Sequence, residues 1–308
     1  MSLVTVVIPA YNAVATISDA IDSVLAQTLQ DFEIIVSDDG SRDGTAAQVS
    51  RYRGDSRIRY IRHENRGASH AKNIACRQAR GEYLAFLDAD DAFDPTALEK
   101  MVRQVQTTDA AWCIVDVVKK IRNQSVIRAT KFPTGDLLLS ILSSDFITRG
   151  PFYVTREFLA IGLFDEELAV REDWDVNIRM IHSRKPFTYV NEPLYVYSRT
   201  EDSLMTGNPR RILTCTERVL RKHHKKLADL GSKEIARIYA ESMWALARQY
   251  LYDLHDGKEA IRCGRESLRN DMNFYRVIHP LIHRMGSPFR TFRKTTRKMA
   301  DQCRRPSP

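Results

Sequence analysis

The chain has 308 residues, of which 43% are hydrophobic, so it is long and apolar enough to bury a sizeable core, which excludes disorder along its whole length. Its formal net charge of +8 comes from an excess of Lys and Arg near the C-terminus. The five cysteines are scattered and never form a Cys-x-x-Cys pair, which argues against a disulfide framework or a zinc site and indicates a reducing cytoplasm.

Short β-branched runs alternate with helical patterns over the first hundred residues. The predicted strands are Val4–Ile8, Phe32–Val36, Ile58–Arg62 and Tyr83–Leu87. The helical patterns that follow them are Ile17–Leu25, Thr45–Tyr52, Ala68–Ala79 and Pro95–Val105. This alternation predicts an α/β fold with a mostly parallel sheet, and the near-continuous apolar character of the strands indicates helices on both faces.

The pattern changes in the second half of the chain. A further strand is predicted at Trp112–Val118, and a mixed region to about Met205 holds a helical segment at Asp173–His182. After Pro209, apolar residues recur at three- and four-residue spacing, most clearly from Ile235 to Leu254. We therefore expect a catalytic α/β domain of residues 1–208 and a basic helical C-terminal region of residues 209–308.

The C-terminal region carries most of the positive charge. Residues 209–308 contain 23 Lys and Arg against 10 Asp and Glu, and Phe289, Phe292 and Met299 lie among the last basic residues. We expect this region to attach to an anionic membrane surface. A solvated helical face is the alternative, and nucleic acid is a less favoured partner, because nothing resembles a reading module.

The sequence also bears on location. The apolar run from Leu3 to Ile8 is far shorter than the roughly 20 residues of a membrane-spanning helix, and no later run reaches that length. We therefore expect a cytoplasmic protein, with the basic region at the inner face of the membrane.

Polar loops follow three of the predicted strands. Ligands of open α/β sheets gather at the carboxyl ends of strands, so these loops are expected to converge on one edge of the sheet. The three loops are Pro9-Ala10-Tyr11-Asn12, Asp38-Asp39-Gly40-Ser41 and Asp88-Ala89-Asp90-Asp91.

The third loop places three carboxylates within four residues at the end of an apolar strand. Like charges at such spacing repel, so we expect a cation to neutralise them. Hard oxygen ligands suit Mg²⁺ or Mn²⁺, which proteins usually hold through one or two carboxylates and substrate phosphates. The alternative is helix capping by Asp91 or Asp94 before Pro95, but Asp88 and Asp90 lie too far upstream to cap.

The second loop is a weaker signal. Turns and helix caps explain many acidic loops, and Asp43 with Thr45 is expected to serve only the structure. A strand-end aspartate can also accept a hydrogen bond from a nucleobase N–H, while Tyr11 on the neighbouring loop offers a flat face for stacking.

Two predicted helix starts carry further charged residues. Arg66 and Lys72 flank a helix start whose backbone N–H groups make a plausible anion site, with capping by Ser69 as the alternative. Glu172 and Asp173 open a later helix, where acidic residues often only complement the helix dipole.

Taken in order, these segments resemble the family 2 glycosyltransferases of GT-A fold, including bacterial enzymes that build surface polysaccharides. The resemblance covers residues 3–205. It rests on the combined order and spacing of Val6–Asn12, Asp38–Ser41, Asn65–Gly67, Asp88–Asp91, Gly162–Asp165 and Glu172–Trp174.

The resemblance implies how a nucleotide-sugar donor binds. Tyr11 would stack on the nucleobase, typically uracil, and Asp39 would accept a hydrogen bond from its ring N–H. Asp88 would contact the ribose, and Asp90 would hold the Mn²⁺ or Mg²⁺ that bridges the two phosphates. The other donor-binding residues implied are Pro9, Ala10, Asn12, Arg66, Lys72 and Ala89.

The resemblance also implies the chemistry. Asp173 would be the general base that takes the proton of an acceptor hydroxyl, with Glu172 beside it shaping the acceptor side. Because the metal assists departure of the diphosphate, one base on the opposite side suffices for direct displacement with inversion. The expected acceptor is a glycan or lipid-linked saccharide of cell-surface polysaccharide biosynthesis, selected by residues 115–170 and by the helical region.

One segment departs from the family pattern. Relatives often carry Tyr-Arg-x-His-x-x-Ser near the end of the catalytic domain, and the comparable stretch here runs from Tyr197 to Ser203. Thr200 stands where that histidine would be. Thr200 is therefore not expected to contact the metal or the diphosphate as that histidine would. Arg199 could take the place of the histidine electrostatically.

Two other classes of protein share parts of this pattern. A receiver-like phosphoacceptor carries its acidic pair after the first strand, whereas Asp38 and Asp39 follow the second. A non-catalytic nucleotide-sugar-binding partner subunit stays open as the alternative, since it would bind donor without turnover. Asp90 and Asp173 favour an enzyme over such a subunit.

Overall fold

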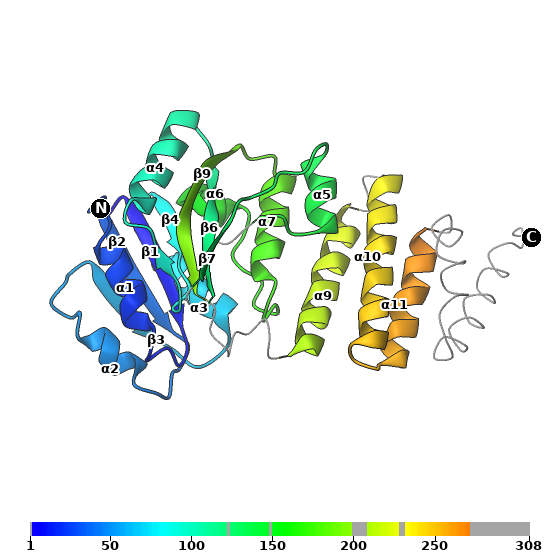
Figure 1. The fold of residues 1–308 in the computed structure, drawn as a ribbon, viewed down its shortest axis with the longest axis horizontal. Helices are drawn as coiled ribbons and strands as arrows, with labels where there is room; N and C mark the ends of the chain where they lie inside the picture. The colour runs from blue at the N-terminus through cyan, green and yellow to red at the C-terminus, as the bar shows by residue number, and fades with distance from the viewer. Residues whose placement is uncertain (1, 122–123, 148–149, 199–207, 228–231, 272–308) are drawn as a thin grey trace, which may run out of the picture. The chain divides into compact units, whose positions relative to one another are not determined.

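The computed structural model describes residues 2–121, 124–147, 150–198, 208–227 and 232–271. The chain forms two compact units, residues 1–141 with 145–207 and residues 142–144 with 208–308. Figure 1 shows a sheet flanked by helices in the first unit and a set of helices in the second. The residues on which the membrane prediction rests, Phe289, Phe292 and Met299, lie outside the described part of the chain.

The first unit is built on a mixed sheet with nine strands among the described residues (Figure 1). The strand order is β3-β2-β1-β4-β8-β6-β9-β5, with β7 beside β6. The run from β3 to β4 is parallel, as expected, while β8 is antiparallel to both β4 and β6. The strands are β1 Val4–Ala10, β2 Phe32–Asp38, β3 Ile58–Arg62, β4 Tyr83–Phe86, β5 Ala92–Phe93, β6 Trp112–Ile121, β7 Gln124–Arg128, β8 Phe152–Val154 and β9 Phe187–Ser198.

Helices cover this sheet because its central strands are apolar on both faces. Almost every residue of β1 and β2 is buried. Helix α1 packs on β1 and β5, α3 on β1 and β2, and α4 on β6 and β9. The helices of this unit are α1 Ile17–Leu25, α2 Thr45–Ser50, α3 Ala68–Gln78, α4 Ala97–Thr108, α5 Leu137–Ser143, α6 Thr155–Ala160 and α7 Glu172–His182.

The start of α4 corrects one expectation from the sequence. Asp94 was expected to cap a helix beginning at Pro95, but its Oδ1 instead accepts from the backbone N–H and the hydroxyl of Thr96, at 2.9 and 2.7 Å. This bond across two residues forms a turn, and the helix begins only at Ala97. The helix ends after Thr108, because Asp109 adopts the left-handed conformation with φ 50°.

The second unit contains helices α9 Pro209–Leu227, α10 Lys233–Tyr252 and α11 Gly257–Asn270. The predicted apolar spacing is confirmed in α10, whose buried face includes Tyr239, Met243 and Ala247. Side chains cap all three helices, since Asn208 accepts from the N–H of Arg211, Ser232 from that of Ile235 and Asp256 from that of Glu259. None of the helices that the structure describes is long and apolar enough to cross a membrane.

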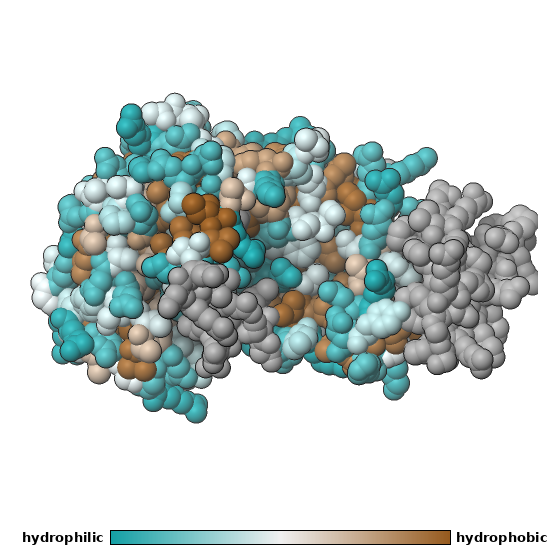
Figure 2. All heavy atoms as spheres, in the orientation of Figure 1, coloured by the Kyte–Doolittle hydropathy of each residue, from teal (hydrophilic) through white to brown (hydrophobic). Residues whose placement is uncertain are grey.

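Hydrophobic side chains are scattered on the face of the molecule seen in Figure 2. They form small groups between hydrophilic residues on that face of the first unit. Isolated exposed hydrophobic residues are normal in folded proteins. Tyr11, which directly follows β1, is 51% exposed, and this exposure is relevant to the site described below.

Gly81, two residues before β4, packs closely against the backbone of β1. A Cβ atom added to it would lie 2.4 Å from the backbone nitrogen of Thr5, and its own N–H donates to Thr5 Oγ1 at 2.9 Å. We expect Gly81→Ala to lower the free energy of unfolding by roughly 1–3 kcal/mol, because the backbone of β1 must shift. Equilibrium denaturation in urea measures the change.

The matched control is Gly54→Ala, where an added Cβ meets nothing within 4 Å. We expect this change to stay within about 0.5 kcal/mol of wild type. Equal losses for both substitutions would contradict the assigned cause.

Candidate active site

The carboxyl ends of three neighbouring parallel strands carry the polar loops singled out in the sequence. Strands β2, β1 and β4 lie side by side, so the loops after Asp38, Ala10 and Phe86 leave the same edge of the sheet. The structure thus brings these loops together at the place where α/β folds bind ligands.

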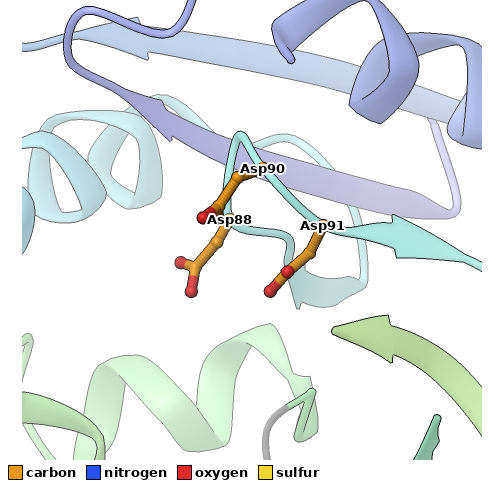
Figure 3. Close-up of side chains that lie close together, drawn as sticks. All are labelled: Asp88, Asp90 and Asp91. Carbon is orange, nitrogen blue, oxygen red and sulfur yellow. The ribbon is translucent and has the colours of Figure 1, made fainter. Parts of the chain in front are cut away.

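The acidic cluster lies in the turn that follows β4. Ligand oxygens of Asp88, Asp90 and Asp91 all lie within 4.8 Å of one another. Figure 3 shows the three side chains leaving one tight turn, with Asp88 and Asp91 pointing to the same side. Asp88 and Asp90 are half-buried and Asp91 is buried. Three hard oxygen donors at this spacing are a donor set suited to Mg²⁺ or Mn²⁺.

Asp91 also fastens the turn to β9. Its Oδ2 accepts from the hydroxyl of Tyr195 at 2.6 Å, and its Oδ1 accepts from the backbone N–H of Ser198 at 2.9 Å. The same Tyr195 oxygen accepts from the N–H of Asp88 at 3.3 Å. Asp91 therefore does not cap α4, contrary to the alternative raised from the sequence, and instead sets the direction in which the turn presents Asp88 and Asp90.

The two acidic residues at the end of β2 have separate structural partners. Asp38 is buried and accepts from the N–H of Ser41 and from the hydroxyl of Tyr60. Asp39 accepts from the backbone N–H groups of Arg66 at 2.7 Å and Gly67 at 2.8 Å. Asp39 thereby holds the loop before α3 against the end of β2. Each carboxylate oxygen can accept more than one hydrogen bond, so these contacts are compatible with a further donor.

The loop after β1 is held by side-chain contacts to the loop after β2. Asn12 has a positive φ of 50°, its N–H donates to Ser41 Oγ, and its Oδ1 accepts from the N–H of Arg42. Asp43 accepts from Thr45 and from the N–H of Val14, as expected for a structural residue. The side chain of Tyr11, on this loop, is exposed to solvent. Pro9 and Ala10 form the end of β1.

Lys72 joins the strand-end region to the start of α7. This lysine of α3 is buried, and its Nζ lies 2.8 Å from Oε1 of Glu172 and 5.1 Å from the centre of the Phe164 ring. Burial alone would lower the pKa of Lys72, but the charges of Glu172, Asp88 and Asp173 outweigh it, and the pKa is raised. The ammonium group therefore stays protonated among carboxylates that come from distant parts of the sequence.

The rest of the predicted anion site at the start of α3 is arranged differently. Arg66 is largely exposed and lies 3.8 Å from Glu166. Gly67, with φ 100°, precedes the helix, and no side chain caps it. Ser69 lies within the helix and donates to the carbonyl of Leu168, so its assignment as a cap was wrong.

The start of α7 carries Glu172 and Asp173 in its first turn. Arg171 precedes the helix with φ 69°, and Asp173 Oδ1 accepts from the N–H of Trp174 at 2.8 Å. The Trp174 ring is fixed by its own N–H, which donates to the carbonyl of Ile141 at 2.7 Å. Glu172 and Asp173 complement the helix dipole, and their charges also act on Lys72. Their role as dipole partners is therefore compatible with a role in the site.

The segment Gly162–Asp165, one of those that carry the family resemblance, is hydrogen-bonded to both α3 and α7. Asn73 of α3 exchanges two hydrogen bonds with the backbone of Phe164, at 2.9 and 3.0 Å. Arg179 of α7 donates to the carbonyls of Ile161, Gly162 and Leu163. The segment thereby holds the Phe164 ring beside Lys72.

Asp145 also belongs to this region, although no sequence motif indicates it. Its Oδ1 accepts from the N–H of Ile147 at 3.2 Å and from the side-chain amide of Asn177, on α7, at 3.3 Å. Burial raises the pKa of Asp145 to about 7, and the negative charge of Asp173 adds to the rise. No recognisable motif surrounds this residue, so only its spatial proximity to α7 reveals it.

Arg199 and Thr200, where the sequence departs from the family pattern, lie outside the described residues.

The mixed sheet with its flanking helices is that of a GT-A fold, and the sequence comparison identifies the family. The profile described as "Glycosyl transferase family 2" matches residues 5–159, and the chain belongs to this family. Together these findings confirm the family and fold predicted from the sequence.

The curated relatives are longer than the region they share with this chain. A 215-residue match, 30% identical, joins 66% of this chain to 62% of the "Uncharacterized glycosyltransferase EpsJ" of Bacillus subtilis. A 195-residue match, 28% identical, joins 63% of this chain to 28% of the chondroitin synthase of Escherichia coli.

Solved structures show the same fold at low sequence identity. Residues 1–349 of TarS from S. aureus, in complex with UDP-GlcNAc, superpose with a TM-score of 0.68 at 20% identity, covering 87% of this chain and 81% of that one. The mannosyltransferase PcManGT from Pyrobaculum calidifontis, in complex with GDP-Man and Mn²⁺, gives 0.54 at 21% identity, covering 94% and 83%.

We expect Asp145→Asn to stabilise the protein at high pH and not at low pH. The folded-state pKa of Asp145, about 7, lies above the roughly 3.9 of an unfolded aspartate, so the native state binds more protons between these values. Wild-type stability therefore falls as pH rises from about 4 to about 7, and asparagine removes that loss. Urea denaturation at pH 4.5 and pH 8 measures the difference.

Asp173→Asn serves as the companion variant. It removes the neighbouring charge that helps to raise the pKa of Asp145, and should make the pH dependence of stability shallower. A difference between wild type and Asp145→Asn that is the same at both pH values would contradict the assignment.

Proposed function

We propose that the chain transfers a sugar, with inversion, from a nucleoside diphosphate donor to a hydroxyl group of a glycan or lipid-linked saccharide. In this proposal residues 1–208 are the catalytic domain, and residues 209–308 are a basic helical region. The observation that carries the proposal is the convergence of the Asp88–Asp91 cluster and the Glu172–Asp173 pair on one buried lysine, Lys72.

The acidic cluster fits a divalent cation. Its three carboxylates offer hard oxygen ligands within 4.8 Å, and two of them are partly accessible. We assign Asp90 as the metal ligand and Asp88, with Ala89 between them, to the donor. A bound Mn²⁺ or Mg²⁺ would stabilise, as a Lewis acid, the negative charge that develops on the departing diphosphate.

The nucleotide would lie against the loops after β1 and β2. The exposed ring of Tyr11 offers a stacking surface, and Asp39 offers carboxylate oxygens to a base N–H. Pro9, Ala10 and Asn12 would shape the same wall, and Arg66 is accessible to the donor. TarS complexes with UDP-GlcNAc and with UDP support a uridine nucleotide, while the PcManGT complex contains GDP-Man.

The acceptor would approach the start of α7. Asp173 would take the proton from the attacking hydroxyl, and Glu172 would shape the acceptor side while it binds Lys72. With one base and a stabilised leaving group, a single displacement suffices, and the anomeric configuration inverts. Lys72 would add positive charge between the acceptor side and the donor side, so we give it an electrostatic role rather than the direct phosphate contact first expected.

The biological setting is proposed from the relatives. One of them is a chondroitin synthase, which supports a glycan acceptor and a role in cell-surface polysaccharide biosynthesis. The excess of Lys and Arg in residues 209–308 supports peripheral attachment at the inner face of the membrane.

We expect Asp90→Asn to remove the metal dependence of donor binding. Wild-type protein should bind UDP at least tenfold more tightly with Mn²⁺ than with EDTA, because an ion held by Asp90 would supply positive charge to the diphosphate. The variant should bind UDP equally weakly in both conditions. Isothermal titration calorimetry measures both affinities.

Asp19→Asn is the control for this experiment, since Asp19 is an exposed carboxylate of α1. It should keep the full effect of Mn²⁺. If wild type binds UDP with the same affinity in EDTA and in Mn²⁺, the metal assignment fails.

We expect Asp173→Asn to separate binding from turnover. Loss of a general base costs typically 10²–10⁴-fold in rate, so kcat should fall at least 100-fold while the Kd for UDP with Mn²⁺ stays within twofold of wild type. A panel of nucleotide-sugar donors, followed by mass spectrometry of transfer and of slow donor hydrolysis, identifies the substrate first. An unchanged kcat would refute the base assignment, and donor binding without any turnover by wild type would favour the non-catalytic partner subunit.

A further inference from the structure

Strand β7 is an edge strand whose side chains are exposed on both faces. Among the described strands it pairs with β6 alone (Figure 1), and every side chain from Ser125 to Ala129 is exposed. Val126 and Ile127 are 48% and 62% exposed. Because they are consecutive, one of these apolar side chains lies on each face of the β6–β7 hairpin. Exposed apolar residues are usually scattered singly, so an apolar strand exposed on both faces needs a further explanation.

The β6–β7 hairpin is also basic. Residues 117–135 contain five Lys and Arg and no Asp or Glu, although residues 1–208 as a whole carry a net charge of −5. The side chains of Lys120, Arg128 and Lys131 are exposed. None of these three residues forms an ion pair within the described part of the chain. Their positive charge is therefore accessible to an anionic partner.

Apolar and basic side chains occur together on each face of the hairpin. Lys120 is in register with Ser125, so its side chain lies on the same face as that of Ile127, two residues further along β7. Val126 and Arg128 share the opposite face for the same reason. Each face thus combines one exposed aliphatic side chain with one exposed positive charge.

The hairpin lies at the edge of the sheet that carries the acidic turn. Strand β8 is antiparallel to both β4 and β6, so β6 runs in the same direction as β4 and ends at the same edge. Lys120 is in register with Ser198 of β9, and the N–H of Ser198 donates to Asp91 at 2.9 Å. The end of the hairpin is therefore close to the proposed donor and acceptor site.

Protection of the sheet edge explains only part of this surface. Lysine and other charged residues on an edge strand discourage pairing with a further strand, which accounts for the basic residues. An exposed aliphatic strand has the opposite effect, so Val126 and Ile127 are not accounted for. A soluble acidic polymer would use the positive charges but gain little from aliphatic side chains. A lipid interface uses both, because aliphatic groups enter the acyl boundary while basic groups meet anionic headgroups.

We propose that the β6–β7 hairpin docks the first unit on an anionic lipid surface. Strand β7 meets the lipid along its free edge, where water among the headgroups still satisfies its backbone groups. Val126 and Ile127 enter the interface, and the exposed basic residues on both faces contact the headgroups. This surface goes beyond the proposed function, since lipid binding does not require sugar transfer. Where the proposed function holds, a docked hairpin beside the acidic turn favours a lipid-linked saccharide over a soluble glycan as the acceptor.

Co-sedimentation of the full chain with vesicles tests the proposal. Vesicles of phosphatidylcholine with about 30% phosphatidylglycerol are compared with vesicles of pure phosphatidylcholine. The apolar variant combines Val126→Gln with Ile127→Gln, and the charge variant combines Lys120→Gln with Arg128→Gln. Residues 209–308 are unchanged in every variant, so any vesicle binding of their own is the same throughout.

Each variant has a matched control at exposed positions of the first unit. Leu159→Gln removes an apolar side chain of α6 that is 43% exposed. Arg53→Gln combined with Arg103→Gln removes two exposed positive charges. Circular dichroism and Tm verify that each variant folds. The Kd for UDP with Mn²⁺ is measured separately, so a failure of the proposed function there is distinguishable from a failure of lipid docking.

Both hairpin variants should bind the anionic vesicles at least tenfold more weakly than wild type. A basic residue near an anionic surface contributes about fivefold to binding, and two are removed in the charge variant. Both controls should stay within twofold of wild type. Absence of vesicle binding by wild type, or equal losses in hairpin and control variants, overturns the proposal. Loss of binding to heparin by the charge variant, with vesicle binding unchanged, overturns it in favour of a soluble acidic polymer.

A tryptophan probe tests whether the hairpin itself enters the lipid. Ile127→Trp keeps an apolar side chain at this position, and brominated phosphatidylcholine in the vesicles quenches the fluorescence of tryptophan that contacts the acyl chains. We expect more quenching than in wild type for Ile127→Trp and no increase for Leu159→Trp. If Ile127→Trp is quenched no more than wild type, the hairpin does not dock, even where other residues hold the chain on vesicles.

Discussion

The ion pair of the buried Lys72 ammonium is the interaction on which the arrangement of the first unit's strand-end region depends. A buried charge is tolerated only when it is paired, and Lys72 pairs with Glu172, 100 residues later in the sequence. The fields of Asp88 and Asp173 reach the same group. Without the Lys72 ammonium, the carboxylates at the end of β4 and those at the start of α7 would repel one another. Lys72 therefore lets two acidic segments lie near each other before any ligand binds.

The contacts around Lys72 explain why sequence segments that carry the family resemblance occur together, although they are far apart in the chain. Asn73 and Arg179 both hydrogen-bond to the loop that contains Phe164, and the Phe164 ring lies 5.1 Å from the Lys72 ammonium. Asp91 and Tyr195 likewise fix the turn that presents Asp88. Each segment thus has a direct role or a supporting role in placing charge. A buried ion pair contributes little net stability, so its value here lies in positioning.

The sequence predicted the features that depend on local pattern. Strand β3 and helix α1 were predicted with their observed bounds, because apolar runs and helical spacing are local signals. The loops at the ends of β1, β2 and β4 were expected on one edge because parallel strands require it. Contacts between distant residues were not predictable: the sequence did not indicate that Lys72 pairs with Glu172 or that Asp145 lies beside α7. Helix capping by Asp94 or Ser69 was an alternative raised from the sequence. Asp94 forms a local turn with Thr96 instead, whereas the partner of Ser69, the carbonyl of Leu168, is 99 residues away in the sequence.

Positive charge is distributed unevenly along the chain, which affects how an anionic donor could bind. Residues 1–208 carry a net charge of −5 and residues 209–308 a net charge of +13. Exposed charges are screened over about 8 Å at physiological ionic strength, so basic helices cannot by themselves neutralise a diphosphate bound elsewhere. A donor that approaches the acidic strand end needs positive charge there, and among the described residues Lys72 provides it in a buried place. The three carboxylates of the Asp88–Asp91 turn offer oxygen ligands there, so the proposed divalent cation would bring the further positive charge that a nucleoside diphosphate needs.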